Sequence, residues 1–322
     1  MKRRTAVGLL GAAAAGSLDG GFFPARAAAQ SKLQKVSLLS VPNDSSGEMY
    51  YARELGLWAK YGLDVDVKSA NDPSATAAAV LSGNTTFGGL TTPGLAIAHE
   101  RKIPIVIAAP TSMYSSAAPT SGLVVLKNSP IQKAADLNGK TIATRDISNL
   151  SYYGAKLWID KNGGDTKTIK WYEVEDNLAL AAMKAGRVDA ASVSEPALDD
   201  ALHGPDGRLL AACYDAIGKS FLIAAHYCTA EFAAQNPEIV QAFCDATIAA
   251  GIWANKHHAE SGKILERYVG VPVASDSTRV TYAERVRPAD AQPVLDALYL
   301  YGVIKAPLRA ADLFAPQLHV AG

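Results

Sequence analysis

The sequence predicts an α/β fold with two lobes, each a mainly parallel sheet flanked by helices. Short apolar segments alternate with helical patterns along the chain, which is typical of parallel strands covered by helices on both faces. The alternation begins near Val36 and restarts near Gly122. A chain of 322 residues, 49% of them hydrophobic, is long enough to bury the cores of two lobes.

The first lobe is expected to open with four strands separated by helices. The strands are expected at 36–41, 63–67, 85–90 and 103–109. The second of them alternates apolar and polar residues, whereas the fourth is apolar on both faces. Helices are expected over 46–61, over 71–84 and from Thr91 onward, where Pro93 suits the first turn.

The second half of the chain repeats this rhythm and then becomes mainly helical. Strands are expected at 122–126, 141–144, 168–172, 188–192, 209–213 and 221–225. Helices are expected from 148, over 177–184 and from 196, and most of the chain from 236 onward is expected to be helical, including 290–301. No repeat with the period of a solenoid is visible.

Residues 1–29 have the three-part order of an export signal. Met1–Arg4 is basic, the next residues are mostly Ala, Gly, Leu and Val, and Ala27–Ala29 forms a small-residue cleavage site. The adjacent arginines are similar to a twin-arginine signal, but Asp19 within the apolar run leaves that route and the Sec route both open. The first cysteine is Cys213, so we expect a cleaved periplasmic protein without a lipid anchor.

Composition argues against nucleic acid and metal as ligands. The 31 basic and 31 acidic residues form no long block of one sign, and nucleic-acid binding usually requires a basic stripe. The six histidines and three cysteines lack the spacing of a metal site. Cys213, Cys228 and Cys244 are expected to be buried small side chains, and pairing of the first two in an oxidising compartment is left open. No cofactor is predicted.

Several short segments resemble, in the same order along the chain, those of the binding proteins for alkanesulfonate, taurine, nitrate and thiamine-pyrimidine precursors. These segments are Gly56–Val65 (GLWAKYGLDV), Leu81–Gly88 (LSGNTTFG), Asp136–Ile142 (DLNGKTI), Ala185–Ala190 (AGRVDA) and Glu195–Pro196. The family's Asp-Phe-Gly is replaced here by Thr86-Phe87-Gly88. The matching segments span essentially the whole chain after the signal.

The resemblance implies a type II periplasmic-binding-protein fold whose two lobes are joined by two crossing strands, near Ser121–Gly122 and near Cys213–Tyr214. Lobe 1 would comprise 36–121 and 214–322, and lobe 2 would comprise 122–213. It also implies a function: the periplasmic, monomeric solute-binding component of an ABC importer. Such a protein captures a small organic molecule, here expected to be anionic, by hinge closure and delivers it to an inner-membrane permease. We therefore expect it to have no enzymatic activity.

Ligands of open α/β sheets bind beyond the carboxyl ends of the strands, where helices also begin. This rule selects polar and aromatic residues in the loops that follow the predicted strands. The candidates in lobe 1 are Asn43, Asp44, Ser46, Tyr50, Thr91, Thr92, Met113 and Tyr114. The candidates in lobe 2 are Arg145, Ser148, Asn149, Tyr152 and Glu195.

These candidates have alternative roles that the sequence leaves open. Hydroxyl groups at helix starts, as at Thr91 and Ser148, can bind an anionic oxygen or only cap the helix. Arg145 can fork onto a carboxylate or sulfonate, or pair with a surface acid such as Asp146. Glu195 can accept a hydrogen bond from a ligand amine or fix its own loop. The tyrosines can form aromatic walls or ordinary core.

Two other functions share the predicted fold. A related branch of this fold makes the thiamine pyrimidine, but the cysteine-rich run of that branch is absent from this sequence. The G-x-S-x-G, H-E-x-x-H and G-x-x-x-x-G-K motifs are absent as well. A ligand sensor that presents its closed lobes to a receptor is the third candidate. The ligand itself remains open between a sulfonate, a carboxylate and a small heterocycle.

Overall fold

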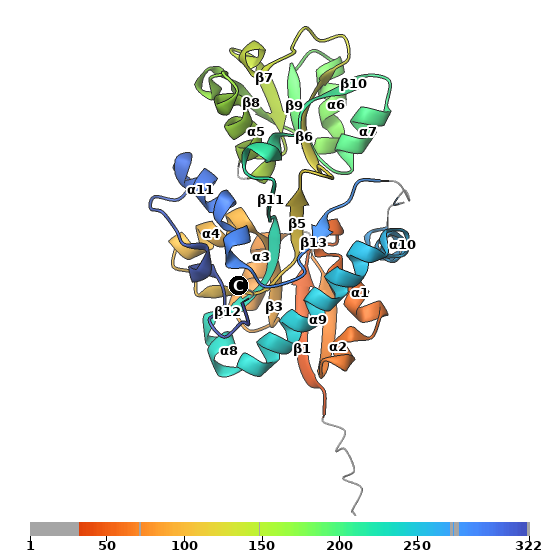
Figure 1. Ribbon diagram of the computed structural model, residues 1–322, viewed down its shortest axis with the longest axis vertical. Coiled ribbons are helices and arrows are strands. Elements are labelled where there is room, and N and C mark those ends of the chain that lie inside the picture. The colour runs from red at the N-terminus through yellow and green to blue at the C-terminus, as the bar shows by residue number, and fades with distance from the viewer. Residues whose placement is uncertain (1–31, 71, 148, 271–272, 274–276, 321–322) are drawn as a thin grey trace, which may run out of the picture. The chain divides into compact units, whose positions relative to one another are not determined.

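Two five-stranded sheets, each flanked by helices, form most of the chain (Figure 1). The computed structural model describes residues 32–322 except 71, 148, 271–272, 274–276 and 321–322. The predicted export signal at 1–29 lies outside the described residues. The prediction of an α/β fold is confirmed, since strands and helices alternate over most of the chain from Gln34 to His203.

The first sheet combines strands from distant parts of the sequence. Its order is β2 (Leu63–Ser69), β1 (Gln34–Ser40), β3 (Phe87–Thr91), β12 (Ala224–Thr229) and β4 (Ile105–Pro110). β1 is parallel to β2 and β3, but β12 is antiparallel to both of its neighbours. The sequence predicted one strand over 221–225. The structure divides this region at Ile223, so that β12 begins at Ala224.

The second sheet is mixed. Its order is β10 (Gly207–Ala211), β6 (Ser121–Leu126), β9 (Ala190–Ser194), β7 (Thr141–Thr144) and β8 (Lys170–Glu173). β7 is parallel to β8 and β9, whereas β6 is antiparallel to β9 and β10. The expectation of a mainly parallel sheet therefore holds for only part of it. The carboxyl ends of β7 and β9 lie at the same edge, since these strands run in the same direction.

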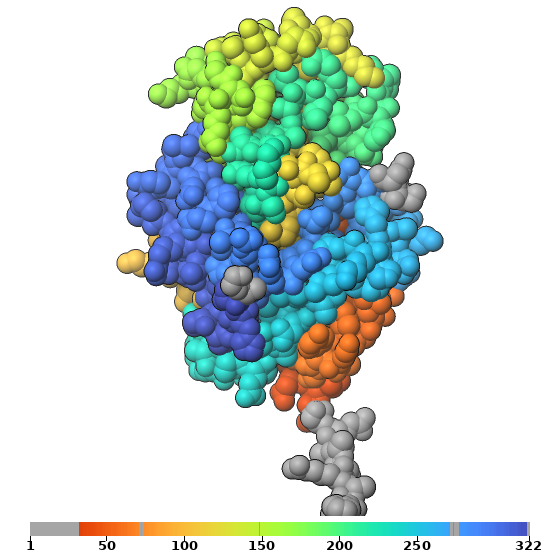
Figure 2. Space-filling view, viewed as in Figure 1, coloured from red at the N-terminus to blue at the C-terminus, as the bar shows by residue number. Residues whose placement is uncertain are grey.

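A small antiparallel sheet contains strands that the sequence patterns did not reveal. Its order is β11 (Ser220–Leu222), β5 (Ser112–Ser115) and β13 (Thr281–Tyr282). In the space-filling view, the yellow segment around β5 lies against the green segment that leads into β11 (Figure 2). The chain passes from the first sheet to the second after β5 and returns through β11.

The helices have the following bounds: α1 (Glu48–Glu54), α2 (Leu57–Lys60), α3 (Pro73–Leu81), α4 (Thr92–Glu100), α5 (Leu150–Lys161), α6 (Asp176–Lys184), α7 (Ala197–His203), α8 (Ala230–Gln235), α9 (Pro237–Lys256), α10 (His258–Val269) and α11 (Gln292–Leu300). The helix expected over 46–61 is divided in two at Gly56, whose φ of 64° lies in the left-handed region that favours glycine. In the part of the chain that the structure describes, no helix is long and apolar enough to span a membrane.

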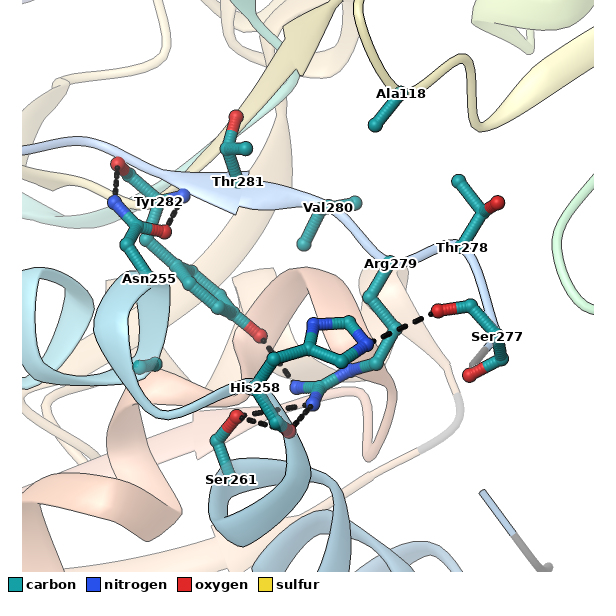
Figure 3. A pocket seen from close by; sticks show the side chains of 11 residues that line it. Ala118, Asn255, His258, Ser261, Ser277, Thr278, Arg279, Val280, Thr281 and Tyr282 are labelled. Carbon is teal, nitrogen blue, oxygen red and sulfur yellow. Dashed lines mark hydrogen bonds between the residues drawn. The ribbon is translucent and has the colours of Figure 1, made fainter. Parts of the chain in front are cut away.

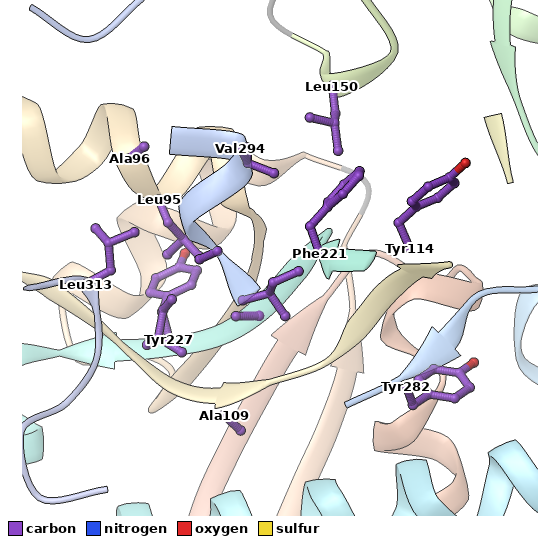
Figure 4. Close-up of a cluster of buried hydrophobic side chains, with 14 of the residues drawn as sticks. Leu95, Ala96, Ala109, Tyr114, Leu150, Phe221, Tyr227, Tyr282, Val294 and Leu313 are labelled. Atoms are coloured by element: carbon purple, nitrogen blue, oxygen red, sulfur yellow. The ribbon is translucent and has the colours of Figure 1, made fainter. Parts of the chain in front are cut away.

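Aromatic rings fill the space between the first sheet and α9. The ring of Phe87 on β3 stacks on Phe243 of α9 with centroids 3.8 Å apart, and Trp58 stacks on the same phenylalanine at 5.2 Å. On the other side of β12, Figure 4 shows Tyr227 together with Leu95 and other apolar side chains. Such packing fixes the positions at which the strands of this sheet end.

The three cysteines are free and buried. Burial raises the pKa of the Cys213 and Cys228 thiols to about 12, and it also raises the pKa of Cys244. Cys213 and Cys228 are therefore unpaired in this structure, and all three residues occupy core positions as small apolar side chains, as the sequence analysis expected.

Candidate functional site

A cavity of about 490 Å³ lies where three distant segments meet. The first segment is the loop after β1, the second is the start of α7 after β9, and the third consists of α10 and the chain that follows it. Its lining residues are Pro42, Asn43, Asp44, Glu195, Pro196, Asp199, Asp200, Leu265, Val269, Val273, Ser277, Thr278 and Arg279. Its volume falls within the range of small-molecule sites.

Asp44 and Arg279 form the buried polar centre of this cavity. Nε and Nη2 of Arg279 lie 3.1 and 2.9 Å from Oδ1 of Asp44, and the backbone N–H of Val280 donates to Oδ2 at 2.9 Å. Burial opposes the charge of the Arg279 guanidinium, but Asp44 outweighs burial and raises the pKa of Arg279 above its ordinary value. The guanidinium of Arg279 therefore keeps its charge.

The remaining donor of Arg279 holds the start of α10. Nη1 donates to the carbonyl oxygen of His258 at 3.0 Å and to Oγ of Ser261 at 3.0 Å (Figure 3). The hydroxyl of Tyr282 donates to Asp44 from the other side at 2.8 Å. Donors around both carboxylate oxygens thus fix the loop after β1 against the C-terminal part of the chain.

A second cavity of about 320 Å³ adjoins the first and shares Ser277, Thr278 and Arg279 with it. Asn255 closes one side, because its side chain exchanges hydrogen bonds of 2.9 Å with the backbone of Tyr282 (Figure 3). Both cavities therefore depend on the same short segment before β13.

Glu195 contributes one of the carboxylates that line the larger cavity. It follows β9, its peptide bond to Pro196 is cis, and its Oε2 accepts a hydrogen bond from the backbone N–H of Asp199 at 3.0 Å. Burial raises the pKa of Glu195 to about 7, although the bond from Asp199 opposes the shift. The neighbouring carboxylates of Asp199 and Asp200 raise it further. Glu195 therefore titrates near neutral pH.

Glu48 is a buried acid near this network that the sequence analysis missed. It is only 1% exposed, and neither carboxylate oxygen has a hydrogen-bond partner. Burial raises the pKa of Glu48 well above its ordinary value, and Asp44 adds to the shift. Burial therefore favours the neutral form of the Glu48 carboxyl. Its position in the Ser46–Glu48 helix start gave no sign of burial, because acids are common and exposed in first turns.

Three of the predicted residues, Asn43, Asp44 and Glu195, line the larger cavity. Two neighbours of the first loop are buried behind it. Ser46 shares a hydrogen bond of 2.8 Å with Ser40, and Tyr50 bonds Ser69 at 2.8 Å while its ring stacks on Tyr268. The ligand roles predicted for these residues stay predictions.

The other candidates of lobe 1 lie outside both cavities, at the ends of β3 and in β5. Thr91 caps α4 through a bond of 3.4 Å from the N–H of Gly94, and Thr92 is fully buried and donates to the carbonyl of Leu222. Tyr114 is also fully buried, and its hydroxyl donates to Asp215 at 2.8 Å. Met113 is half-buried in β5.

The described candidates Arg145, Asn149 and Tyr152 lie around the start of α5. Arg145 is exposed and pairs with Glu175, with Nε and Oε2 3.7 Å apart. Asn149 caps α5 by accepting from the N–H of Ser151, and the ring of Tyr152 meets Trp171 edge to face. Ser148 lies outside the described residues. None of the three described candidates lines either cavity.

The sequence pattern of the proteins described as "NMT1/THI5 like" matches residues 43–261, about two thirds of the chain. The chain belongs to this family. Its match begins at Asn43 in the cavity and includes Glu195. It ends before Leu265, Val269 and Arg279, so one wall of the cavity comes from the part that follows the family's matched region.

Known structures share the fold at low sequence identity. The periplasmic aliphatic sulphonate binding protein SsuA of Escherichia coli aligns with a TM-score of 0.73 and 18% identity, over 88% of this chain and 98% of its own. The periplasmic nitrate-binding protein NrtA of Synechocystis PCC 6803 aligns with a TM-score of 0.68 and 17% identity, over 89% and 86%. These likenesses establish the solute-binding-protein fold.

Two further similar proteins differ from each other in function. A Brucella abortus protein that carries the name of a binding protein is 23% identical over 284 residues, 84% of this chain and 86% of its own. The desulfurization enzyme DSZB aligns with a TM-score of 0.66 and 14% identity, over 88% and 96%. The same fold therefore occurs in binding proteins and in an enzyme, and function has to be argued from the site.

Proposed function

We propose that this protein is the periplasmic solute-binding component of an ABC importer. It captures a small organic molecule between two lobes, 36–121 with 214–322 and 122–213, and delivers it to an inner-membrane permease. The observation that carries the proposal is the larger cavity, which is lined by the loop after β1, by the residues after β9 and by α10. These segments adjoin different sheets, so hinge motion between the sheets would open and close the cavity.

The comparisons support this proposal through the relatives' own functions. SsuA and NrtA are periplasmic proteins that bind a sulphonate and nitrate, and the Brucella relative also carries the name of a binding protein. The predicted signal at 1–29 would direct this chain to the same compartment. No cysteine precedes Cys213 to carry a lipid, so the mature protein would be free in that compartment. We propose that it acts there as a monomer.

We further propose that the protein binds its ligand without turning it over. Its thiols are buried and neutral, because burial raises the pKa of Cys213 and Cys228 to about 12. His226 is 1% exposed, so its ring cannot reach a bound molecule. Burial also lowers the pKa of His226 to about 3. The larger cavity is lined by carboxylates, one engaged guanidinium, the amide of Asn43, the hydroxyl groups of Ser277 and Thr278, and apolar side chains. Neither the buried thiols nor His226 is part of this lining, so they are not placed to act as nucleophile or base there.

Mass spectrometry of the purified protein tests the proposal. We expect a small molecule to co-purify, to dissociate when the protein is unfolded in urea, and to raise the melting temperature when it is returned to the refolded protein. The recovered molecule should be chemically unchanged after incubation. Conversion of the molecule would favour the enzyme, and the absence of any stabilising small molecule would contradict the proposed function.

A further inference from the structure

We infer that the larger cavity selects an organic ammonium ion, a small molecule that carries a positively charged nitrogen on an apolar body. This inference rests on the proposed function, because it names the charge class of the molecule that the cavity captures. It addresses a question that the sequence left open, since Arg145 favoured an anion and Glu195 favoured an amine.

The charge of the cavity is the first argument. Four carboxylates line it, namely Asp44, Glu195, Asp199 and Asp200, against the single guanidinium of Arg279. Arg279 compensates Asp44, with which it forms a buried ion pair. Asp199 and Asp200 remain, and so does Glu195 above its pKa of about 7. Asp199 approaches Nδ1 of the exposed His203 at 3.0 Å, a contact that is an ion pair only when that histidine is protonated.

The second argument is that no cation of the lining is available to an anion. Each of the three nitrogens of the Arg279 guanidinium already donates to a protein oxygen, on Asp44, His258, Ser261 or Tyr51. A ligand sulfonate or carboxylate would have to displace these bonds in a buried site. Arg145 does not line the cavity and pairs with Glu175 instead.

The third argument concerns the apolar side of the cavity. Leu265 and Val269 from successive turns of α10, together with Val273, face the space that the acids of α7 also line. An organic body can pack on these side chains while its cationic end meets the carboxylates. The volume of the cavity and its apolar wall indicate a small organic ligand, without reference to the acids. The acids then favour a positive charge on that ligand.

A bare metal ion does not fit the same arrangement. Divalent cations need several oxygen ligands at about 2.0–2.6 Å around one point. Across the described residues, no group of three or more His, Cys, Asp or Glu side chains is close enough to hold a metal. The acids of the cavity do not converge on one point, so they suit an organic ammonium ion better than a bare metal ion.

The test compares probes of similar size and different charge on the full chain. Benzylammonium and phenyltrimethylammonium are the cations, benzyl alcohol is the neutral probe and benzenesulfonate is the anion. Isothermal titration calorimetry and thermal shift are measured at pH 7.5. We expect only the two ammonium ions to bind and to raise the melting temperature. Their affinity should fall with added salt, because charge attraction is screened.

Charge-removing variants locate the binding. Glu195→Gln and Asp200→Asn should each weaken ammonium binding about 10-fold, since each removes one carboxylate from the lining. Glu238→Gln, an exposed acid in the first turn of α9 and outside both cavities, should leave it unchanged. Urea unfolding of each variant verifies that it is folded.

The possible results separate the two proposals. Preferential binding of benzenesulfonate, or ammonium binding that the two cavity variants do not weaken, would overturn the ammonium inference and leave the solute-binding function in place. If no probe binds and nothing co-purifies with the protein, both proposals fail. A co-purified molecule with a positively charged nitrogen, bound less tightly by Glu195→Gln, would support both.

Discussion

Arg279 and Asp44 form an ion pair that joins the chain before β13 to the loop after β1, 235 residues away in sequence. The side chain of Arg279 is 5% exposed and that of Asp44 is 25% exposed. Two guanidinium nitrogens, a backbone N–H and a tyrosine hydroxyl surround one carboxylate. The position of one wall of the cavity therefore depends on a single buried charge pair.

Replacement of Arg279 by Met should reduce the free energy of unfolding by up to about 3–5 kcal/mol, because it removes the counter-ion of the half-buried Asp44 carboxylate. Urea unfolding at pH 7 measures the loss. Arg309→Met is the matched control, since Arg309 forms an exposed pair with Asp312 at 2.7 Å. That control should change stability by less than about 1 kcal/mol. Equal losses in both variants would show that the buried pair has no special role.

Glu48 should make the protein less stable as the pH rises. Its pKa in the folded chain lies well above the ordinary value of 4.5, so the folded chain keeps a proton that the unfolded chain releases above that pH. Below pH 4.5 both states are protonated and the effect vanishes. Glu48→Gln should remove up to about 1.4 kcal/mol per pH unit from the decline in stability that begins as the pH rises above 4.5.

The measurement for Glu48 is a series of urea unfolding curves at several pH values for the two proteins. The difference between them isolates Glu48, because Glu195 and the other titrating groups are common to both. Parallel stability curves for the variant and the natural sequence would contradict a buried, protonated Glu48.

Arg145→Ala should have little effect. Arg145 and Glu175 are 56% and 66% exposed and 3.7 Å apart, a geometry in which solvent screens most of the attraction. We expect a change in unfolding free energy below about 0.5 kcal/mol and unchanged affinity for the co-purified ligand. A loss of affinity of 10-fold or more would restore the role of anion-binding residue that the sequence suggested for Arg145.

The three cysteines should resist alkylation in the folded protein. Cys213, Cys228 and Cys244 are buried with raised pKa values, and only the thiolate reacts with iodoacetamide. Intact mass spectrometry should show no adduct under native conditions and three adducts in urea without a reductant. A single adduct in urea would instead indicate a bridge between two of the thiols.

The sequence predicted the parts of the fold that local patterns determine. The alternating residues of 63–67 became β2, and the Pro93 signal was placed correctly in the first turn of α4. The strands β5 and β13 were not predicted, because four and two residues carry too little periodicity. These strands exist through pairing with each other and with β11, segments far apart in the sequence.

For the site, the rule of strand ends led to Asn43, Asp44 and Glu195 but could not reach Arg279. Arg279 follows no strand, and its importance comes from Asp44, which no local pattern connects to it. The β-favouring residues Val280, Thr281 and Tyr282 were the one available signal that this segment is more than a loop. Similarly, nothing local distinguishes the buried Glu48 from an exposed acid at a helix start.

The central place of β12 in the first sheet has a consequence for how the chain folds. β3 and β4 flank it and precede it by more than 110 residues, so their facing edges stay unpaired until Ala224–Thr229 arrives. Contacts of such long sequence separation form slowly, and open strand edges are prone to aggregation. A chain that ends before β12 would have a split sheet, and dependence on a holding chaperone should be greatest in that interval.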